Sequence, residues 1–140
     1  DKTGTRYRSH DSSKSVLNSK ASMQYCLGCH TSDKVKTVKD MVAYVRNAQK
    51  SVAEKDAAVA KKQDETFDLL KVAIEGKKLD EKAINEAKFK YAVAAYYKEF
   101  VYGNRGATPG EKVAHNPEKN RRYLEKALSV LDEAQTILKN

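Results

Sequence analysis

The sequence predicts an all-α fold: an elongated helical bundle of one very long helix and two shorter helices, preceded by an irregular N-terminal arm. Charged residues make up 33% of the 140 residues, with only two prolines and six glycines, a composition typical of long solvated helices. Apolar residues also recur at helical spacing over most of the chain. The length suits one domain, in which we expect residues 1–31 to form the arm and residues 32–140 the helical part.

Residues 1–22 predict the irregular arm. They are mostly polar, and Val16 and Leu17 form their one apolar pair. A segment this polar buries too little apolar surface to fold by itself. We therefore expect a cofactor edge or a neighbouring chain to hold it in place.

The longest helix is predicted to begin near Thr31, with Ser32 or Asp33 as its cap, because neither proline nor glycine follows before Gly76. About 43 residues would span roughly 65 Å, so this helix must project from the domain or pack along a partner. We expect Gly76 at the left-handed cap position. The residues of its core-facing seam alternate at spacings of four and three, with polar interruptions: Val38, Val42, Val45, Gln49, Val52, Asp56, Val59, Gln63, Thr66, Leu70 and Ala73.

Two more helices are predicted from their start signals. Asp80 caps a helix that runs to about Tyr102. Asn116-Pro117-Glu118 starts the last helix, with asparagine as N-cap, proline at the first helical position and an acid in the first turn. The helix that starts at Asp80 carries two apolar faces, which predicts burial on two sides. One face has Ile84, Lys88, Tyr91, Ala95, Lys98 and Tyr102, and the other has Phe89, Val93, Tyr96 and Phe100.

The segment Cys26-Leu27-Gly28-Cys29-His30 has the Cys-x-x-Cys-His pattern of covalent haem c attachment. Two thiols one helical turn apart can reach the two vinyl groups on one porphyrin edge, and the adjacent imidazole can bind the iron. We therefore predict one haem c per chain, joined to Cys26 and Cys29, with His30 as the proximal ligand. A thioredoxin-like pair would need a preceding strand and a zinc site two more ligands, and the sequence offers neither nearby.

The sequence leaves four candidates for the sixth iron ligand, opposite His30: His10, His115, Met23 and Met41. Both methionines fit better as apolar packing residues than as ligands. His10 lies in the predicted arm and His115 directly precedes the predicted N-cap, so each could also be a surface or turn residue.

The net charge of +8 restricts the partners. A basic surface suits nucleic acid, anionic lipid or an acidic protein. No aromatic ladder or nucleic-acid motif accompanies the charge, and no apolar run approaches the ~18 residues of a membrane span. Two interpretations of the positive charge remain. It attracts an acidic redox partner protein, or it is simply a solvated helix surface.

The stretch from Ser9-His10-Asp11 to His30 resembles the last-haem region of the pentahaem ammonia-forming cytochrome c nitrite reductases. The similarity continues through the long helix and Lys88-Phe89-Lys90-Tyr91-Ala92 to His115-Asn116-Pro117-Glu118 and the last helix. It covers about residues 9–140, but only the C-terminal part of such an enzyme. The resemblance implies a helical dimer interface, His30 as proximal ligand of the final haem, and His10 and His115 as distal ligands of neighbouring haems.

The catalytic haem of that family sits on a Cys-x-x-Cys-Lys motif, which this sequence lacks. We therefore expect a monohaem electron carrier that is not an enzyme and has no catalytic residues. If His10 and His115 keep their roles, haems of neighbouring chains complete one another in a homo-oligomer or filament. The alternatives are a fragment or subunit of a multihaem nitrite-reductase-like enzyme, and a five-coordinate cytochrome that binds nitric oxide or carbon monoxide.

Covalent haem attachment predicts a periplasmic or extracellular protein. No signal peptide is visible and Asp1 is not a translation start. We expect the chain to be either a mature product or a piece of a larger protein.

Overall fold

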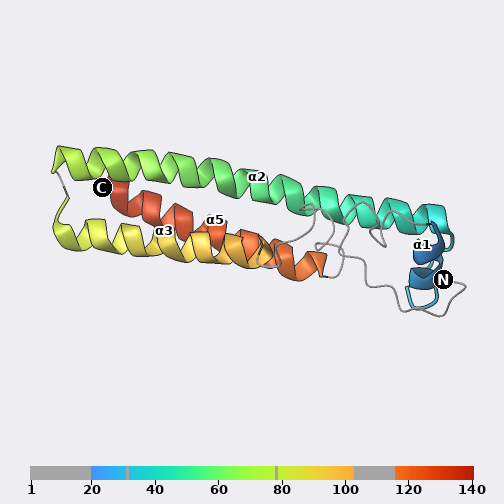
Figure 1. Cartoon of the computed structure of the whole chain (residues 1–140). Coiled ribbons are helices and arrows are strands. Elements are labelled where there is room, and N and C mark those ends of the chain that lie inside the picture. Colours follow the sequence, from blue (N-terminus) through green and yellow to red (C-terminus); the bar gives the residue numbers. More distant parts are fainter. Residues whose placement is uncertain (1–19, 31, 78, 103–115) are drawn as a thin grey trace, which may run out of the picture.

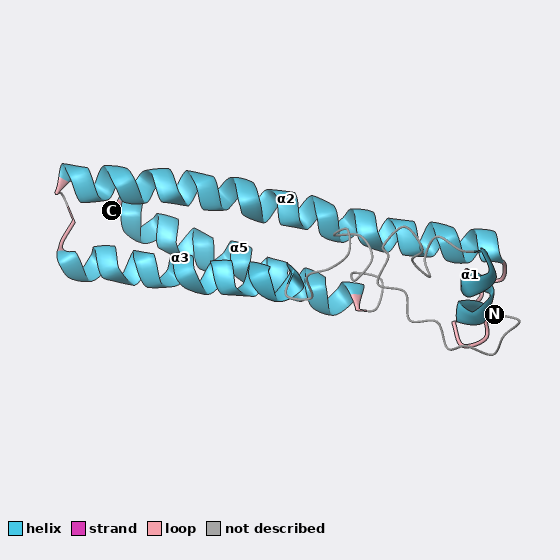
Figure 2. Ribbon diagram, viewed as in Figure 1, coloured by secondary structure: helices cyan, strands magenta, loops and turns pink. Residues whose placement is uncertain are grey.

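The structure is a computed structural model that describes residues 20–30, 32–77, 79–102 and 116–140. These residues form four helices: α1 (Lys20–Leu27), α2 (Val38–Gly76), α3 (Glu81–Tyr102) and α5 (Pro117–Lys139). Figure 2 draws no strand in the described part of the chain, so the predicted all-α class is confirmed. None of the helices in these ranges is long and apolar enough to cross a membrane.

Helices α2, α3 and α5 lie side by side in an elongated bundle (Figure 1). Contacts between side chains set their directions. Lys55 pairs with Glu125, and Lys62 pairs with Asp132, so α2 and α5 run in the same direction. The ring of Tyr97 stacks on Tyr123, whereas Lys90 pairs with Glu133 further along α5, so α3 runs in the opposite direction.

The long helix begins at Val38, later than predicted. Thr37 is its N-cap and forms a capping box with Asp40. Ser32 and Asp33 belong instead to a tight turn, in which the Ser32 and Val35 backbones exchange hydrogen bonds of 3.3 and 3.1 Å. The prediction of a start near Thr31 with Ser32 or Asp33 as cap was therefore wrong. The helix has 39 residues and spans roughly 58 Å.

The other ends of the helices agree more closely with the sequence. The Ala83 amide donates to Asp80 Oδ1 at 2.6 Å, and the Lys119 amide donates to Asn116 Oδ1 at 3.1 Å, so both predicted caps are confirmed. Gly76 is the last residue of α2, and the left-handed position falls on Lys77, with φ 49°. Residues 20–27 of the predicted irregular arm form helix α1, which corrects the prediction for that segment.

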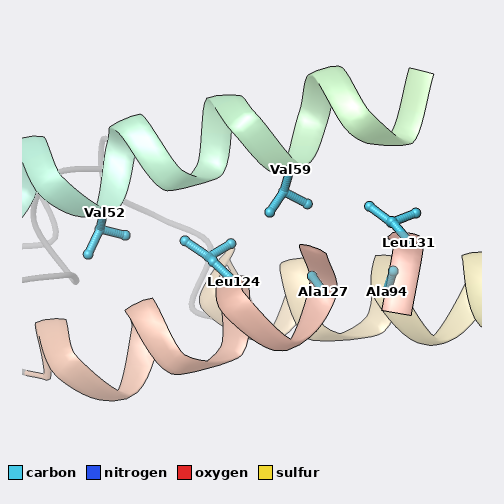
Figure 3. Packing of buried hydrophobic residues seen from close by; sticks show 6 residues of the cluster. All are labelled: Val52, Val59, Ala94, Leu124, Ala127 and Leu131. Atoms are coloured by element: carbon cyan, nitrogen blue, oxygen red, sulfur yellow. The ribbon is translucent and has the colours of Figure 1, made fainter. Parts of the chain in front are cut away.

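The main core lies where the three long helices meet (Figure 3). Its buried residues are Val52, Val59, Ala94, Leu124, Ala127 and Leu131. The predicted seam of α2 is buried at Val52, Val59, Thr66, Leu70 and Ala73, whereas Met41 and Ala48 replace its first members. One polar pair is buried in the bundle: the Gln135 amide donates to Thr66 Oγ1 at 3.1 Å, and that hydroxyl donates to the Lys62 carbonyl at 2.7 Å. Both side chains are therefore hydrogen-bonded, which offsets the cost of burying them.

Among the described residues, the bundle covers one of the two predicted apolar faces of α3. Ala87 and Ala94 are fully buried, and Tyr91, Tyr97 and Val101 pack against the main core. On the other face Phe89 is 69% exposed, Tyr96 66% and Phe100 47%. The prediction that α3 is buried on two sides is therefore correct for the side that faces the main core. The side that carries Phe89, Tyr96 and Phe100 is exposed.

The capping box makes the start of α2 sensitive to pH. The hydroxyl of Thr37 donates to Asp40 Oδ2 at 2.8 Å, and the Lys36 and Thr37 amides donate to the same oxygen at 3.2 and 2.9 Å. These hydrogen bonds favour the carboxylate and lower the pKa of Asp40 below its ordinary value of 3.8. The stability that they contribute is fully present above 3.8 and is lost as the pH falls through the lowered pKa.

We expect Asp40→Asn to destabilise the first turn of α2 at neutral pH, and the difference from the wild type to shrink below pH 3.8. Amide hydrogen exchange of residues 40–44, measured across the acid range, checks this. Asp33→Asn is the matched control, because Asp33 lies in the preceding turn and takes no part in the capping box. A difference between Asp40→Asn and the wild type that does not change with pH would contradict the prediction.

Candidate functional site

The predicted attachment motif lies where α1 ends. Cys26 is in the last turn of α1, and the chain keeps a helical course beyond it. The amide of Cys29 donates to the Cys26 carbonyl at 3.2 Å, and the amide of His30 donates to the same carbonyl at 2.9 Å. These bonds hold Cys29 and His30 three and four residues after Cys26 on a single turn, the spacing at which side chains become neighbours.

A small second core fixes this turn to the bundle. Met23 and Leu27 of α1 are buried against Val35 and against Met41 of α2. Residues Cys26, Val38, Val42 and Val45 pack around them. The motif is thus attached to the free end of the long helix, at the far end of α2 from the turn into α3 (Figure 1).

The chemically active side chains are accessible. Both cysteines are free thiols, with Cys26 half-buried and Cys29 exposed. His30 is also exposed. Beside them the ring of Tyr25 is 85% exposed, which leaves a large apolar side chain uncovered next to the thiols. Gly28 allows a tight turn between the cysteines, because an added Cβ would lie only 3.2 Å from the Tyr25 carbonyl oxygen.

This donor set fits haem c. Thioether attachment needs two reduced thiols at this spacing, and iron ligation needs an imidazole that is free to turn toward the metal. Cys26, Cys29 and His30 provide these three groups on one accessible turn, and no cystine bond ties up the sulfurs.

The rival sites gain no support from the geometry. A helix, α1, precedes the cysteine pair where a thioredoxin-like motif would have a strand. Within the ranges that the structure describes, no group of three or more His, Cys, Asp or Glu side chains could hold a metal ion.

The four candidates for the sixth iron position fall into two groups. Met23 is 1% exposed and Met41 is 3% exposed, and both serve as packing residues of the small core. His10 and His115 lie outside the described residues, so their role stays a prediction.

Sequence reasoning missed two features that position the site. Val35 closes the small core from the turn between α1 and α2, and a lone valine in a polar stretch gave no signal. Thr37 and Asp40 fix where α2 begins. Here the signal existed, because Thr37-Val38-Lys39-Asp40 has the spacing of a capping box.

The profile of a protein family described as Cytochrome c552 matches residues 2–140. No curated protein and no solved structure matches the chain significantly. Members of this family bind haem c and are typically periplasmic, and the resemblance inferred from the sequence is confirmed.

The match also corrects one prediction. From the missing Cys-x-x-Cys-Lys motif we expected a carrier that is not an enzyme. Cytochrome c552 of this family is a nitrite reductase, and the family is therefore one of enzymes, which overturns that expectation. Because the profile covers almost the whole sequence, the chain belongs to the cytochrome c552 family of haem c proteins.

Proposed function

We propose that this chain carries one haem c on Cys26, Cys29 and His30 and passes electrons to and from haems of neighbouring chains within a nitrite-reductase-like cytochrome. The observation that carries the proposal is the accessible turn on which two free thiols and an imidazole lie together. The family match over residues 2–140 supports haem c as the group that they hold.

When bound, the haem supplies one-electron oxidation and reduction. The protein residues hold and orient it. Cys26 and Cys29 would attach the porphyrin at one edge, and His30 would bind the iron from the proximal side. Met23, Leu27, Val35 and Met41 would keep this turn rigid against α2.

The distal ligand is proposed to come from another chain. His10 and His115 match distal ligands of neighbouring haems in the resembled reductases, and each would serve a haem that its own chain does not carry. Two described features support an assembly. Helix α2 spans roughly 58 Å whereas α5 spans roughly 35 Å, so α2 extends past the bundle (Figure 1). The outer face of α3 also leaves Phe89 exposed.

A mixing experiment tests the exported histidines. One variant, Cys26→Ala/Cys29→Ala, keeps His10 and His115 but lacks haem. The other, His10→Ala/His115→Ala, keeps the haem but lacks both distal candidates. We expect the second variant alone to show a high-spin ferric spectrum, and an excess of the first to restore the low-spin, six-coordinate form.

The control for this experiment adds a haem-free chain that also lacks His10 and His115, which must not restore the low-spin form. A monomeric solution mass of the wild type with a bis-histidine spectrum would contradict the proposal. So would a wild-type ferrous spectrum that is high-spin and changes on adding carbon monoxide, because that result identifies a five-coordinate gas-binding cytochrome.

The family match favours a second candidate: the chain as the haem-bearing tail of a multihaem nitrite-reductase-like enzyme. The intact mass of the protein in its source cells distinguishes the two, because a longer parent chain would carry further haem motifs. Under either candidate the haem would be attached outside the cytoplasmic membrane, in the periplasm or beyond it.

A further inference from the structure

An aromatic cluster lies where the end of α3 meets the start of α5. It consists of Tyr96, Tyr97 and Phe100 from α3 and Tyr123 from α5. The rings of Phe100 and Tyr123 have centroids 4.6 Å apart, those of Tyr97 and Tyr123 are 5.9 Å apart, and Tyr96 lies 6.2 and 6.4 Å from Tyr97 and Phe100. The four rings therefore form one contiguous surface, and Tyr96 and Phe100 are 66% and 47% exposed.

Two lysine ammonium groups lie over this cluster. Lys119 Nζ is 5.6 Å from the centroid of Phe100 and 5.8 Å from that of Tyr123, and Lys126 Nζ is 5.7 Å from that of Tyr97. Arg122 lies between them on α5, and its exposed guanidinium pairs with Glu118. An open cavity of about 410 Å³ is lined by Asn116, Glu118, Lys119, Arg122, Tyr123 and Lys126.

None of the acidic residues described in α5 pairs with Lys119 or Lys126. Glu118 pairs with Arg122, Glu125 with Lys55, Asp132 with Lys62 and Glu133 with Lys90. The contacts that Lys119 and Lys126 make in the described part of the chain are with aromatic rings. Among the described residues Arg122 of this surface is paired with Glu118, and the ammonium groups of Lys119 and Lys126 are the charges that a partner would neutralise.

We propose that this surface, formed by Lys119, Arg122, Lys126 and the aromatic cluster, docks an acidic segment of another protein. The cation–π contacts restrict the lysine side chains before binding, so fewer rotamers are lost when carboxylates arrive. The exposed side chains of Tyr96 and Phe100 beside the cations would cover the backbone of such a segment. The inference does not depend on the haem assignment.

The packing of Tyr97, Phe100 and Tyr123, which leaves Tyr96 as the one largely open ring of the cluster, argues against a partner of single-stranded nucleic acid that would stack several bases. Base stacking needs an aromatic face that is open to solvent. Here Tyr97 and Tyr123 stack on each other at 27°, and the lysines lie over Phe100, Tyr123 and Tyr97. Binding of carboxylates requires only accessible cations, and the side chains of Lys119, Arg122 and Lys126 are exposed.

A binding assay with the full chain tests the proposal. The probe is a short, fluorescently labelled oligoglutamate peptide, and its affinity is measured by fluorescence anisotropy at low salt. We expect Lys119→Gln/Lys126→Gln to weaken binding about fivefold to tenfold, because two exposed ion contacts are lost. Lys119→Arg/Lys126→Arg, which keeps both charges, should bind within about twofold of the wild type.

The matched control is Lys50→Gln/Lys61→Gln, which removes the same net charge from exposed positions of α2, where the side chains are 76% and 81% exposed. We expect the control to change affinity by less than about twofold. Equal losses in the two double variants would overturn the proposal, because only net charge would then matter. Tighter binding of oligouridylate, or of phosphatidylserine vesicles, through Lys119 and Lys126 would overturn the assignment of the partner as a protein.

Discussion

Replacing Cys26 and Cys29 together by alanine will abolish covalent haem attachment and leave the three-helix bundle folded. Both thioether bonds require these thiols, and the described residues include no other cysteine. The bundle should survive because its main core, around Val59, Leu124 and Leu131, is separate from the small core that contacts Cys26.

Haem staining after denaturing electrophoresis and the intact mass measure attachment, and far-ultraviolet circular dichroism measures helix content. Gln24→Ala is the matched control, because Gln24 is an exposed neighbour on α1 outside the motif. This control should keep its haem. Covalently bound haem that persists in the double alanine variant would show that the attachment site had been assigned wrongly.

Leu131→Ala will destabilise the bundle by about 2 to 5 kcal/mol. Leu131 is fully buried where α2, α3 and α5 meet, and its side chain lies near Val59 and Ala94 (Figure 3). Leucine and alanine have similar helix propensities, so the loss reports the removed packing and the cavity that it leaves.

Chemical denaturation monitored by circular dichroism gives the free energy of unfolding. The control is Phe89→Ala on the outer face of α3, where the side chain is 69% exposed and the change should be within about 0.5 kcal/mol in the isolated chain. If Leu131→Ala cost no more than Phe89→Ala, the position of the core between the three helices would be wrong.

The sequence correctly predicted two of the helix starts that are set by a capping side chain. Asp80 and Asn116 act as caps where the sequence placed them, because a cap needs only its own side chain and the amides two or three residues later. The start of α2 was misplaced because three candidate caps follow one another in six residues. Burial of Val35 against Met23 and Leu27 turns the chain at Ser32–Val35, and this leaves Thr37 to cap the helix.

Features that depend on tertiary contacts could not be predicted. Helix α1 has eight residues, too few to be stable alone, and Met23 and Leu27 hold it against Met41. The buried seam of α2 includes Met41 near its start because Met41 packs there against Met23 and Leu27 of α1. The left-handed residue moved from Gly76 to Lys77 because α2 continues one residue further.

The proximity of the three site residues was more predictable than the position of the site in the fold. Cys26, Cys29 and His30 adjoin in sequence, so a single helical turn brings them together whatever the rest of the fold does. Lys55 pairs with Glu125, and Lys62 pairs with Asp132. These ion pairs depend on how α2 lies along α5, and the sequence of a single chain does not reveal that alignment.

The most direct test of the haem assignment is peptide mass mapping of the wild-type protein, expressed in cells that attach haem c. We predict that the peptide containing Cys26, Cys29 and His30 carries one haem through two thioether bonds, and that the haem stays attached under acid denaturation. A peptide recovered with two free thiols or a disulfide, with any haem lost into the acid extract, would contradict the account.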